Sequence, residues 1–225
     1  MRLPFTRFGL PQVVVYPLVV LIIMILFFVI FPPALWLIPI EAGLFLIFLW
    51  MLSFFRDPPR KTVQDESVLY SPADGTITDI TQVNEDAVGG QALRIGIFLS
   101  IFNVHINRAP CSVRVGKINY KKGHFKNAMS PEAGRVNESN DITLVRIAEP
   151  ARRLLVRQVS GAIARHIVCD ARENDEYRQG EAFGMIKFGS RTELYVPAED
   201  GKCEVAVKIG DSVRAGLTPL VRYCP

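Results

Sequence analysis

The hydrophobic positions divide the chain into two regions with different patterns. The first region contains an unbroken run of 19 uncharged residues, Val13–Phe31, which is long enough to cross the core of a bilayer as a helix. Pro32-Pro33 ends this run, and a second apolar run, Ala34–Phe55, is interrupted only by Glu41. Because a charge at the middle of a bilayer is costly, we expect Glu41 near the far interface and a short or tilted second span of roughly residues 40–55. The pattern predicts a hydrophobic helical hairpin.

Basic residues flank this hairpin. Arg2 and Arg7 precede the first run, and Arg56, Arg60 and Lys61 follow the second. The positive-inside rule therefore puts both ends in the cytoplasm. A signal peptide is the alternative for the first run, but its length, the lack of a small-residue cleavage site and the second span argue against it. We expect residues 1–60 to anchor a domain of residues 61–225 on the cytoplasmic side of the cell (inner) membrane, where lipid headgroups reach a high effective concentration.

From Ser67 onward the pattern is typical of strands and turns. Short runs with alternating or β-branched residues are separated by Gly, Asp, Asn and Pro. Strands are expected on both sides of a tight turn over Ser71–Gly75 and in five later runs: Val68–Tyr70, Thr76–Ile80, Ala92–Leu99, Val113–Tyr120, Ile142–Ile147, Arg153–Ser160 and Ile163–Cys169. No run has a convincing helical stripe, although Val159–Arg165 is ambiguous.

One internal repeat refines the fold class. Asp175–Gly180 and Asp211–Gly216 share the form Asp-x-apolar-Arg-x-Gly at a period of 36 residues, and a strand-like segment follows each. This arrangement resembles the hammerhead turns of biotinyl- and lipoyl-type domains. We therefore predict a mainly β domain of the barrel-sandwich hybrid kind behind the helical hairpin. A carrier function is not expected, because no lysine lies at a hairpin tip between two methionines.

Composition narrows the classes of function. The chain has 225 residues, of which 49% are hydrophobic, and the excess lies in the hairpin. Residues 61–225 carry 22 basic (26 − 4) and 20 acidic (22 − 2) residues, so nothing suggests binding to nucleic acid. The four cysteines are scattered, which favours reduced thiols over disulfides and makes a metal site unexpected: Cys111, Cys169, Cys203 and Cys224.

The segment Phe183–Arg191 carries the candidate chemistry. It places Ser190 directly after Gly189, and the glycine leaves its own carbonyl unshielded and its backbone free to take unusual angles. A serine hydroxyl is adjacent to the preceding carbonyl, so a strained turn and a base suffice for an N-to-O acyl shift. The alternative is an ordinary Gly-Ser turn. His105 lies in an apolar segment rich in hydrogen-bonding groups, and Asp74 lies in a Pro-Ala-Asp-Gly turn.

Five segments together resemble a known family, the phosphatidylserine decarboxylases in their short, membrane-anchored form. They follow one another at the expected spacings between residues 54 and 190: Phe54-Phe-Arg-Asp-Pro58, Ser71-Pro-Ala-Asp-Gly75, Phe102-Asn-Val-His-Ile-Asn-Arg-Ala-Pro110, Asn137-Glu138 and Phe183-Gly-Met-Ile-Lys-Phe-Gly-Ser190. The Phe-Gly-Ser motif is weak alone, whereas the ordered set is specific.

The resemblance implies an enzyme that makes its own prosthetic group. Ser190 would attack the Gly189 carbonyl, and the ester would break down to a pyruvoyl group. The fragments 1–189 and 190–225 would remain together as a heterodimer or a higher oligomer. The pyruvoyl group would form a Schiff base with phosphatidylserine, carbon dioxide would leave, and phosphatidylethanolamine would be released. No metal and no added cofactor are implied.

The resemblance also assigns roles to residues. His105 is the candidate base for cleavage and the later proton donor, because histidine titrates near neutral pH. Asp74 would orient His105. The longer forms of the family have two histidines three residues apart, where this chain has His105 and Arg108. Either His105 performs both tasks or another residue supplies the base for cleavage. Arg108 is the preferred cation for the headgroup, ahead of Arg56, Arg60, Lys61, Lys121, Lys122 and Lys126.

Two other functions are compatible with parts of the sequence. A membrane-tethered barrel-sandwich adaptor would perform no cleavage, but such adaptors usually follow a single span and lie outside the cytoplasm. A pyruvoyl decarboxylase for a soluble amino acid would have no need for the hydrophobic hairpin. A lipid substrate explains the two regions together.

Overall fold

The computed structural model describes residues 5–31, 35–130, 132–149, 151–162, 166–187, 189–198 and 203–223. The expected features at Arg2, Pro32-Pro33, residues 163–165, Phe188 and Cys224 lie outside these ranges. The chain divides into two compact units, Met1–Pro59 and Arg60–Pro225.

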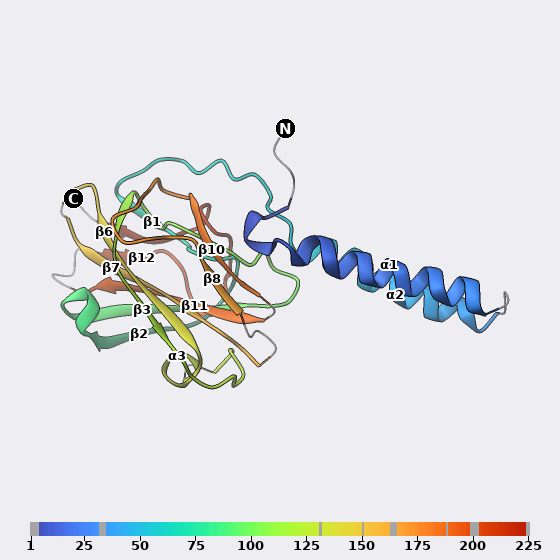
Figure 1. Cartoon of the computed structure of the whole chain (residues 1–225). Helices are drawn as coiled ribbons and strands as arrows, with labels where there is room; N and C mark the ends of the chain where they lie inside the picture. Colours follow the sequence, from blue (N-terminus) through green and yellow to red (C-terminus); the bar gives the residue numbers. More distant parts are fainter. Residues whose placement is uncertain are drawn as a thin grey trace. The chain divides into compact units, whose positions relative to one another are not determined.

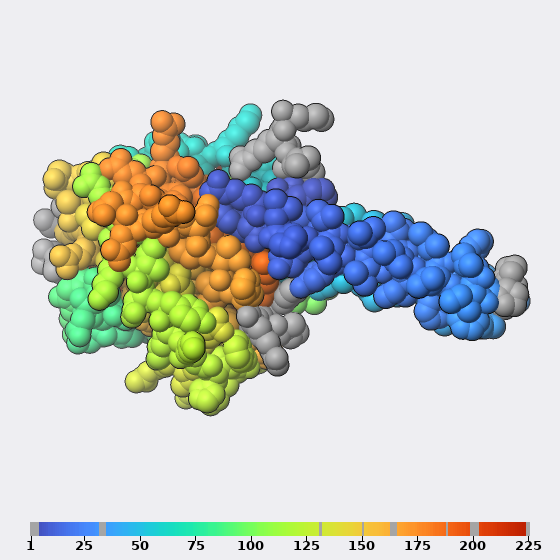
Figure 2. Space-filling view, in the orientation of Figure 1, coloured from blue at the N-terminus to red at the C-terminus, as the bar shows by residue number. Residues whose placement is uncertain are grey.

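The first unit is built from two long apolar helices. After a short 3-10 helix, η1 (Arg7–Gly9), the helices α1 (Gln12–Ile30) and α2 (Leu37–Phe54) lie side by side along their length, in blue in Figures 1 and 2. Their mean hydropathies are 3.3 and 2.1, and most of their apolar side chains are exposed. Both helices are long and apolar enough to cross a membrane. The second helix begins earlier than expected, so Glu41 lies within its second turn.

Backbone contacts join the segment before α1 to the end of α2. The Thr6 N–H donates to the Phe55 carbonyl over 2.9 Å, and Phe5 forms an isolated antiparallel bridge with Arg56. Gly9 packs against the ring of Phe55 so closely that a Cβ there would overlap it. The segment before α1 is thereby fixed to the end of α2.

The second unit is mainly β, as the sequence predicted (Figure 1). An eight-stranded antiparallel sheet has the order β13-β2-β3-β11-β7-β6-β5-β9, and two three-stranded sheets have the orders β4-β10-β8 and β1-β14-β12. The bounds of these strands are β1 (Val68–Tyr70), β2 (Gly75–Glu85), β3 (Gly90–Leu99), β4 (Ile106–Arg108), β5 (Val113–Lys121), β6 (Ser139–Arg146), β7 (Arg153–Val159), β8 (His166–Cys169), β9 (Glu176–Tyr177), β10 (Ala182–Lys187), β11 (Ser190–Pro197), β12 (Cys203–Val205), β13 (Ser212–Val213) and β14 (Pro219–Tyr223). The short helices are η2 (Asp86–Val88) and α3 (Ala133–Val136).

The internal repeat builds two equivalent turns. Asp175 accepts from the Arg172 N–H, and Asp211 accepts from the Lys208 N–H, each over 2.9 Å. The two-residue strand that follows pairs with β5 in the first copy and with β2 in the second. Both repeats end at a glycine with a positive φ, +82° at Gly180 and +69° at Gly216. A Cβ on Gly216 would lie 3.2 Å from the Cα of Gly180, so the two turns meet.

The described part of the ambiguous segment is not helical. β7 ends at Val159, and residues 160–162 form no helix or strand. The turn over Ser71–Gly75 also differs from a simple hairpin, because β1 pairs with β14 whereas β2 pairs with β3 and β13. This turn therefore carries the chain from one sheet to another.

Candidate active site

The Gly189–Ser190 junction lies where the chain passes between two sheets. β10 belongs to the three-stranded sheet with β4 and β8, whereas β11 enters the eight-stranded sheet at Ser190, opposite Leu99 of β3. Gly189 has a φ of +62°, in the left-handed region that favours glycine. The glycine thus permits the bend that separates the two sheets.

The Ser190 hydroxyl points to the buried face of β11. Residues two apart on a strand share a face, so Ser190 points to the same side as Leu194 and Val196, which belong to the main hydrophobic core. The side chain is fully buried, and its Oγ has no hydrogen-bond partner among the described residues. Buried hydroxyls are nearly always paired, so this atom is available for another purpose.

His105 contacts the junction directly. Its Nδ1 lies 2.9 Å from the Asn103 carbonyl oxygen, and the Gly189 N–H donates to its Nε2 over 3.4 Å. A carbonyl can only accept, so Nδ1 carries the proton and Nε2 presents its lone pair to the junction. Asn103 is itself held by Ser100, whose N–H and hydroxyl both donate to Asn103 Oδ1 over 2.8 Å. The loop therefore fixes a neutral, fully buried imidazole beside Gly189.

Asp74 lies at the same end of the eight-stranded sheet but bonds elsewhere. Thr76 pairs with Phe98 on one side of β3, and Ser190 pairs with the adjacent Leu99 on the other, so β3 lies between Ser190 and the strand that follows Asp74. The carboxylate accepts from Arg60 over 2.8 Å and from the Ala215 N–H over 2.7 Å. His105 is not among these partners, and the role of Asp74 in orienting His105 stays a prediction.

Arg108 is packed inside the domain. It lies in β4 opposite Ala182, it is 5% exposed, and its guanidinium donates to the Gly180 carbonyl over 3.1 Å. Its backbone N–H donates to the Pro72 carbonyl over 2.9 Å. The side chain thus contacts the turn that ends the first repeat, and its contribution to headgroup binding stays a prediction.

A chain of buried amides, which the sequence analysis missed, runs along the wall beside Ser190. Asn140 donates to Gln158 over 3.1 Å, Gln158 donates to Asn107 over 2.9 Å, and Asn107 donates to the Thr192 hydroxyl over 3.0 Å. Asn107 lies on β4, and the other three lie on the eight-stranded sheet. This series of hydrogen bonds therefore links the two sheets next to the junction. No regular pattern in the sequence marks it, because Asn107, Asn140 and Thr192 each adjoin other polar residues in their strands.

Lys187 is a second titratable group close to the junction that sequence reasoning did not single out. It ends β10, two residues before Gly189, and is only 4% exposed. Burial lowers the pKa of its ammonium group. A lysine with a lowered pKa is a candidate base, so Lys187 stands beside His105 in that role.

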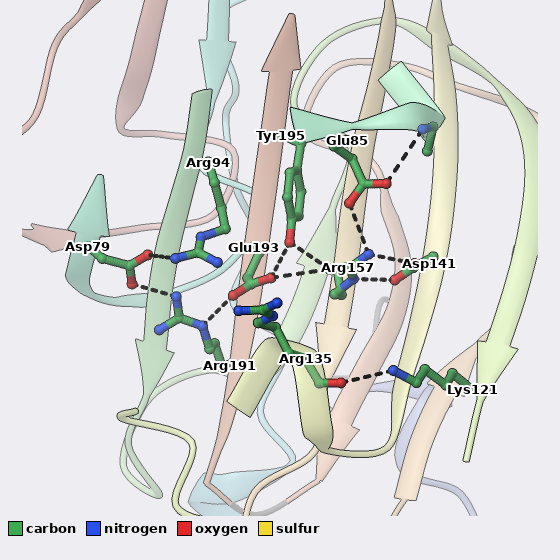
Figure 3. Close-up of polar contacts among 11 residues, drawn as sticks. Asp79, Glu85, Arg94, Lys121, Arg135, Asp141, Arg157, Arg191, Glu193 and Tyr195 are labelled. Carbon is green, nitrogen blue, oxygen red and sulfur yellow. Dashed lines mark hydrogen bonds and ion pairs between the residues drawn. The ribbon is translucent and has the colours of Figure 1, made fainter. Parts of the chain in front are cut away.

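The outer face of β11 carries an ionic network (Figure 3). Arg191 is fully buried, pairs with Asp79, and donates through Nε to Glu193 over 2.7 Å. Burial disfavours the charged form of Asp79, but hydrogen bonds and charge from Arg191 outweigh it and lower the pKa of the carboxyl. Gly96 lies beneath this pair, and a Cβ there would overlap the Arg191 guanidinium. Arg191, the residue after Ser190, is thereby fixed.

The network continues across β7 through Arg157. Its guanidinium donates to Asp141 over 2.5 and 2.8 Å, to Tyr195 over 2.6 Å and to Glu85 over 3.3 Å (Figure 3). The Tyr195 hydroxyl in turn donates to Glu193 over 2.6 Å. Arg94 of β3 also pairs with Asp79 of β2 over 3.1 Å. Ionic contacts therefore join β2, β3, β6, β7 and β11 on the face opposite Ser190.

The described residues contain no cluster of three His, Cys, Asp or Glu side chains suited to a metal ion. Cys111, Cys169 and Cys203 are free thiols, and burial raises the pKa of Cys111 to about 12. At the junction itself the structure brings together a serine hydroxyl, an imidazole and, two residues before Gly189, the side chain of Lys187.

Fold and site together define a class of protein. An apolar helical pair is followed in sequence by a mainly β domain, in which the N–H of a Gly-Ser junction donates to a buried, neutral histidine. The family model for phosphatidylserine decarboxylase matches residues 47–220. The chain belongs to the phosphatidylserine decarboxylase family, as the five sequence segments predicted.

Individual relatives are similar in sequence to this chain over most of its length. A phosphatidylserine decarboxylase proenzyme from Rhodopirellula baltica is 39% identical over 222 residues, which cover 98% of this chain and 89% of the relative. Proteins of the same name from Carboxydothermus hydrogenoformans and Syntrophus aciditrophicus are 44% and 38% identical, over 79% and 95% of this chain and 82% and 95% of their own. The similarity of the first and third extends through the helical pair.

Proposed function

We propose that this chain is the precursor of a pyruvoyl-dependent phosphatidylserine decarboxylase that cleaves itself between Gly189 and Ser190. The observation that carries the proposal is the buried Ser190 hydroxyl, which has no hydrogen-bond partner among the described residues. The preceding residue, Gly189, donates its N–H to His105. A hydroxyl held in this way is available as a nucleophile, and the imidazole supplies an acceptor for its proton.

The proposed self-cleavage proceeds in three steps. Ser190 Oγ attacks the Gly189 carbonyl carbon, the hydroxyl proton passes to a base, and the C–N bond breaks as the nitrogen takes up a proton, which leaves an ester. Loss of the Ser190 α-proton then expels the Gly189 carboxylate and leaves a double bond on residue 190. Water then hydrolyses this dehydroalanine. Its nitrogen leaves as ammonia, the oxygen of water takes its place, and residue 190 becomes the pyruvoyl group. His105 is our candidate base for the first step, and Lys187 is the alternative.

The site fits the finished prosthetic group. Residue 190 begins β11, so the new amino-terminal group would stay at the end of the central sheet, walled by Thr192 and the buried amides. When present, the pyruvoyl group supplies an electrophilic carbonyl that accepts electrons from the substrate as carbon dioxide leaves. His105 would hold the proton for the α-carbon of the product, because it touches the same junction.

The membrane lipid is our proposed substrate because of the apolar helical pair. Two helices able to cross a bilayer would place the domain at the cytoplasmic face of the inner membrane, where the substrate is concentrated. Each basic residue near an anionic surface contributes about 1 kcal/mol of attraction. Arg56, Arg60 and Lys61 follow the second helix in sequence and are candidates for this role.

The intact mass of the purified chain tests the cleavage step. We expect two fragments separated after Gly189, with residue 190 carrying a pyruvoyl group in place of serine. Ser190→Ala should give one uncut chain of 225 residues. A wild-type chain that stays uncut under the same conditions would reject the enzyme and favour a membrane-tethered adaptor.

A second assay identifies the substrate. The cleaved protein is supplied with phosphatidylserine in vesicles or with free serine, and the release of carbon dioxide is measured. We expect release from the lipid alone, together with phosphatidylethanolamine. Release from free serine at an equal rate would favour the soluble amino acid decarboxylase.

A further inference from the structure

The turn that follows β7, Ser160-Gly161, lies against the carbonyl of the Gly189–Ser190 bond. A Cβ built on Gly161 would overlap the Gly189 carbonyl oxygen and lie 3.2 Å from its carbonyl carbon. It would also lie 3.1 Å from the Cβ of Ala128 on the other side. The Gly189 carbonyl therefore occupies space that only a glycine at position 161 leaves open.

Ser160 is the neighbour of Ser190 across the sheet. Arg191 pairs with Val159 in the antiparallel register of β11 and β7, so the next position brings Ser190 opposite Ser160. Directly opposite residues share a face, with Cβ atoms about 5 Å apart. Both serines are fully buried, and the Oγ of each has no hydrogen-bond partner among the described residues. Two facing buried hydroxyls that both lack a partner require an explanation beyond packing.

The backbone around Ser160 is held from both sides. Asn137, part of the Asn-Glu pair noted in the sequence, donates through Nδ2 to the Ser160 carbonyl over 2.8 Å. The same Asn137 amide exchanges hydrogen bonds with the Lys126 backbone over 2.8 and 2.9 Å. The Ser160 N–H donates to the Glu138 carbonyl over 2.9 Å. With the backbone fixed, rotation of the side chain is what remains free at Ser160.

We propose that Ser160 is a positioning residue for self-cleavage. The turn Ser160-Gly161, held by Asn137, fixes the position of the Gly189 carbonyl group. In the reacting state, after rotation of its side chain, the Ser160 hydroxyl donates a hydrogen bond to one lone pair of Ser190 Oγ, so that the other lone pair is directed toward the carbonyl carbon and the Ser190 proton stays free for the base. Ser160 is unchanged by the reaction, and the Ser190 proton still passes to the base. This inference rests on the proposed self-cleavage and concerns its first step, the N-to-O acyl shift.

The test follows the cleavage of full-length chains made by cell-free synthesis in the presence of vesicles. Samples taken over time are separated by size into the uncut chain and the fragment 1–189. We expect Ser160→Ala to slow cleavage about tenfold, which corresponds to the loss of one hydrogen bond in the reacting state. The matched control is Ser139→Ala, a buried serine opposite Val159 on the neighbouring strand, which should cleave at the wild-type rate.

The melting temperature separates positioning from a structural role. Because the Ser160 hydroxyl has no partner to lose in the uncut protein, Ser160→Ala in a Ser190→Ala background should melt no lower than Ser190→Ala alone. Slower cleavage together with a lowered melting temperature would overturn the proposal, as would a wild-type cleavage rate. If the wild-type chain itself stays uncut, it is the proposed function that fails.

Hydroxylamine identifies the step, because it cleaves an ester but not a peptide bond. If Ser160 acts in the acyl shift, the slow variant contains no ester, and hydroxylamine should release no additional fragment. Rapid release on addition of hydroxylamine would show that the ester accumulates, and it would overturn a role in the first step. Gly161→Ala should leave the chain uncut with and without hydroxylamine, because the new methyl group displaces the Gly189 carbonyl. Cleavage of Gly161→Ala at the wild-type rate would also overturn the proposal.

Discussion

At the scale of single residues, the junction combines three features that are individually ordinary. Gly189 supplies a positive φ, Ser190 supplies a buried hydroxyl, and His105 turns an unprotonated nitrogen toward the same backbone. The imidazole is oriented by a carbonyl, that of Asn103, and the Asp74 carboxylate is engaged by Arg60 and Ala215. The structure therefore holds the histidine as a neutral acceptor, the form that a base requires.

His105 is the first residue to test as the base. We expect His105→Ala to slow self-cleavage about 100-fold or more, because general base catalysis typically contributes this much. The uncut and cut chains are separated by size during cell-free synthesis. His124→Ala serves as the control, because that histidine is exposed and should leave the rate unchanged.

Full cleavage of His105→Ala would remove His105 from this step. Lys187 would then be the next candidate, because burial lowers the pKa of its amine two residues before Gly189. In that case Lys187→Met, which keeps an unbranched side chain but removes the amine, should stop cleavage.

At the scale of elements, β11 has two faces with different functions. Ser190, Thr192 and Leu194 face the interior, whereas Arg191, Glu193 and Tyr195 join the ionic network of Figure 3. The sequence predicted the strands that alternate apolar and polar residues, but not β11. Its buried charges have the composition of an exposed loop, and their partners on β2 and β7 make burial possible.

The network makes the free energy of unfolding depend on pH. Arg191 lowers the pKa of Asp79 below its ordinary value of 3.8, so the folded chain binds fewer protons there than the unfolded chain. The resulting stabilisation is complete above that value and is lost as the pH falls through the lowered pKa. We therefore expect the free energy of unfolding, measured with urea, to decline below about pH 5.

Asp79→Asn provides the comparison. It should lower the free energy of unfolding at neutral pH by about 3 kcal/mol, because Arg191 is left buried with one carboxylate fewer. It should also make the decline in acid shallower than in the wild-type chain. An equal decline in both proteins would assign the acid sensitivity to other carboxylates.

At the scale of the whole molecule, the proposed cleavage site, the Gly189–Ser190 bond, lies between two sheets and not within one. The motifs in the sequence predicted roles for Ser190, His105 and Asp74, which stay predictions, and the repeat indicated the paired turns. They did not reveal Gln158, Asn107 or Ser160, because these residues meet only after β4, β7 and β11 are brought together from distant parts of the chain. Contacts of this kind have no local pattern from which to predict them.

The same topology predicts that cleavage does not release the smaller fragment. A chain beginning at Ser190 contributes β11, which lies between β3 and β7, and β14, which lies between β1 and β12. All eight residues of β11 are buried, so separation would expose the centre of the main sheet. We expect the two fragments to copurify and to melt in one transition. They should separate only in concentrated denaturant. A smaller fragment that is lost on gel filtration without denaturant would show that β11 leaves the sheet after cleavage. The heterodimer predicted from the family resemblance would then be wrong, even if self-cleavage itself occurs.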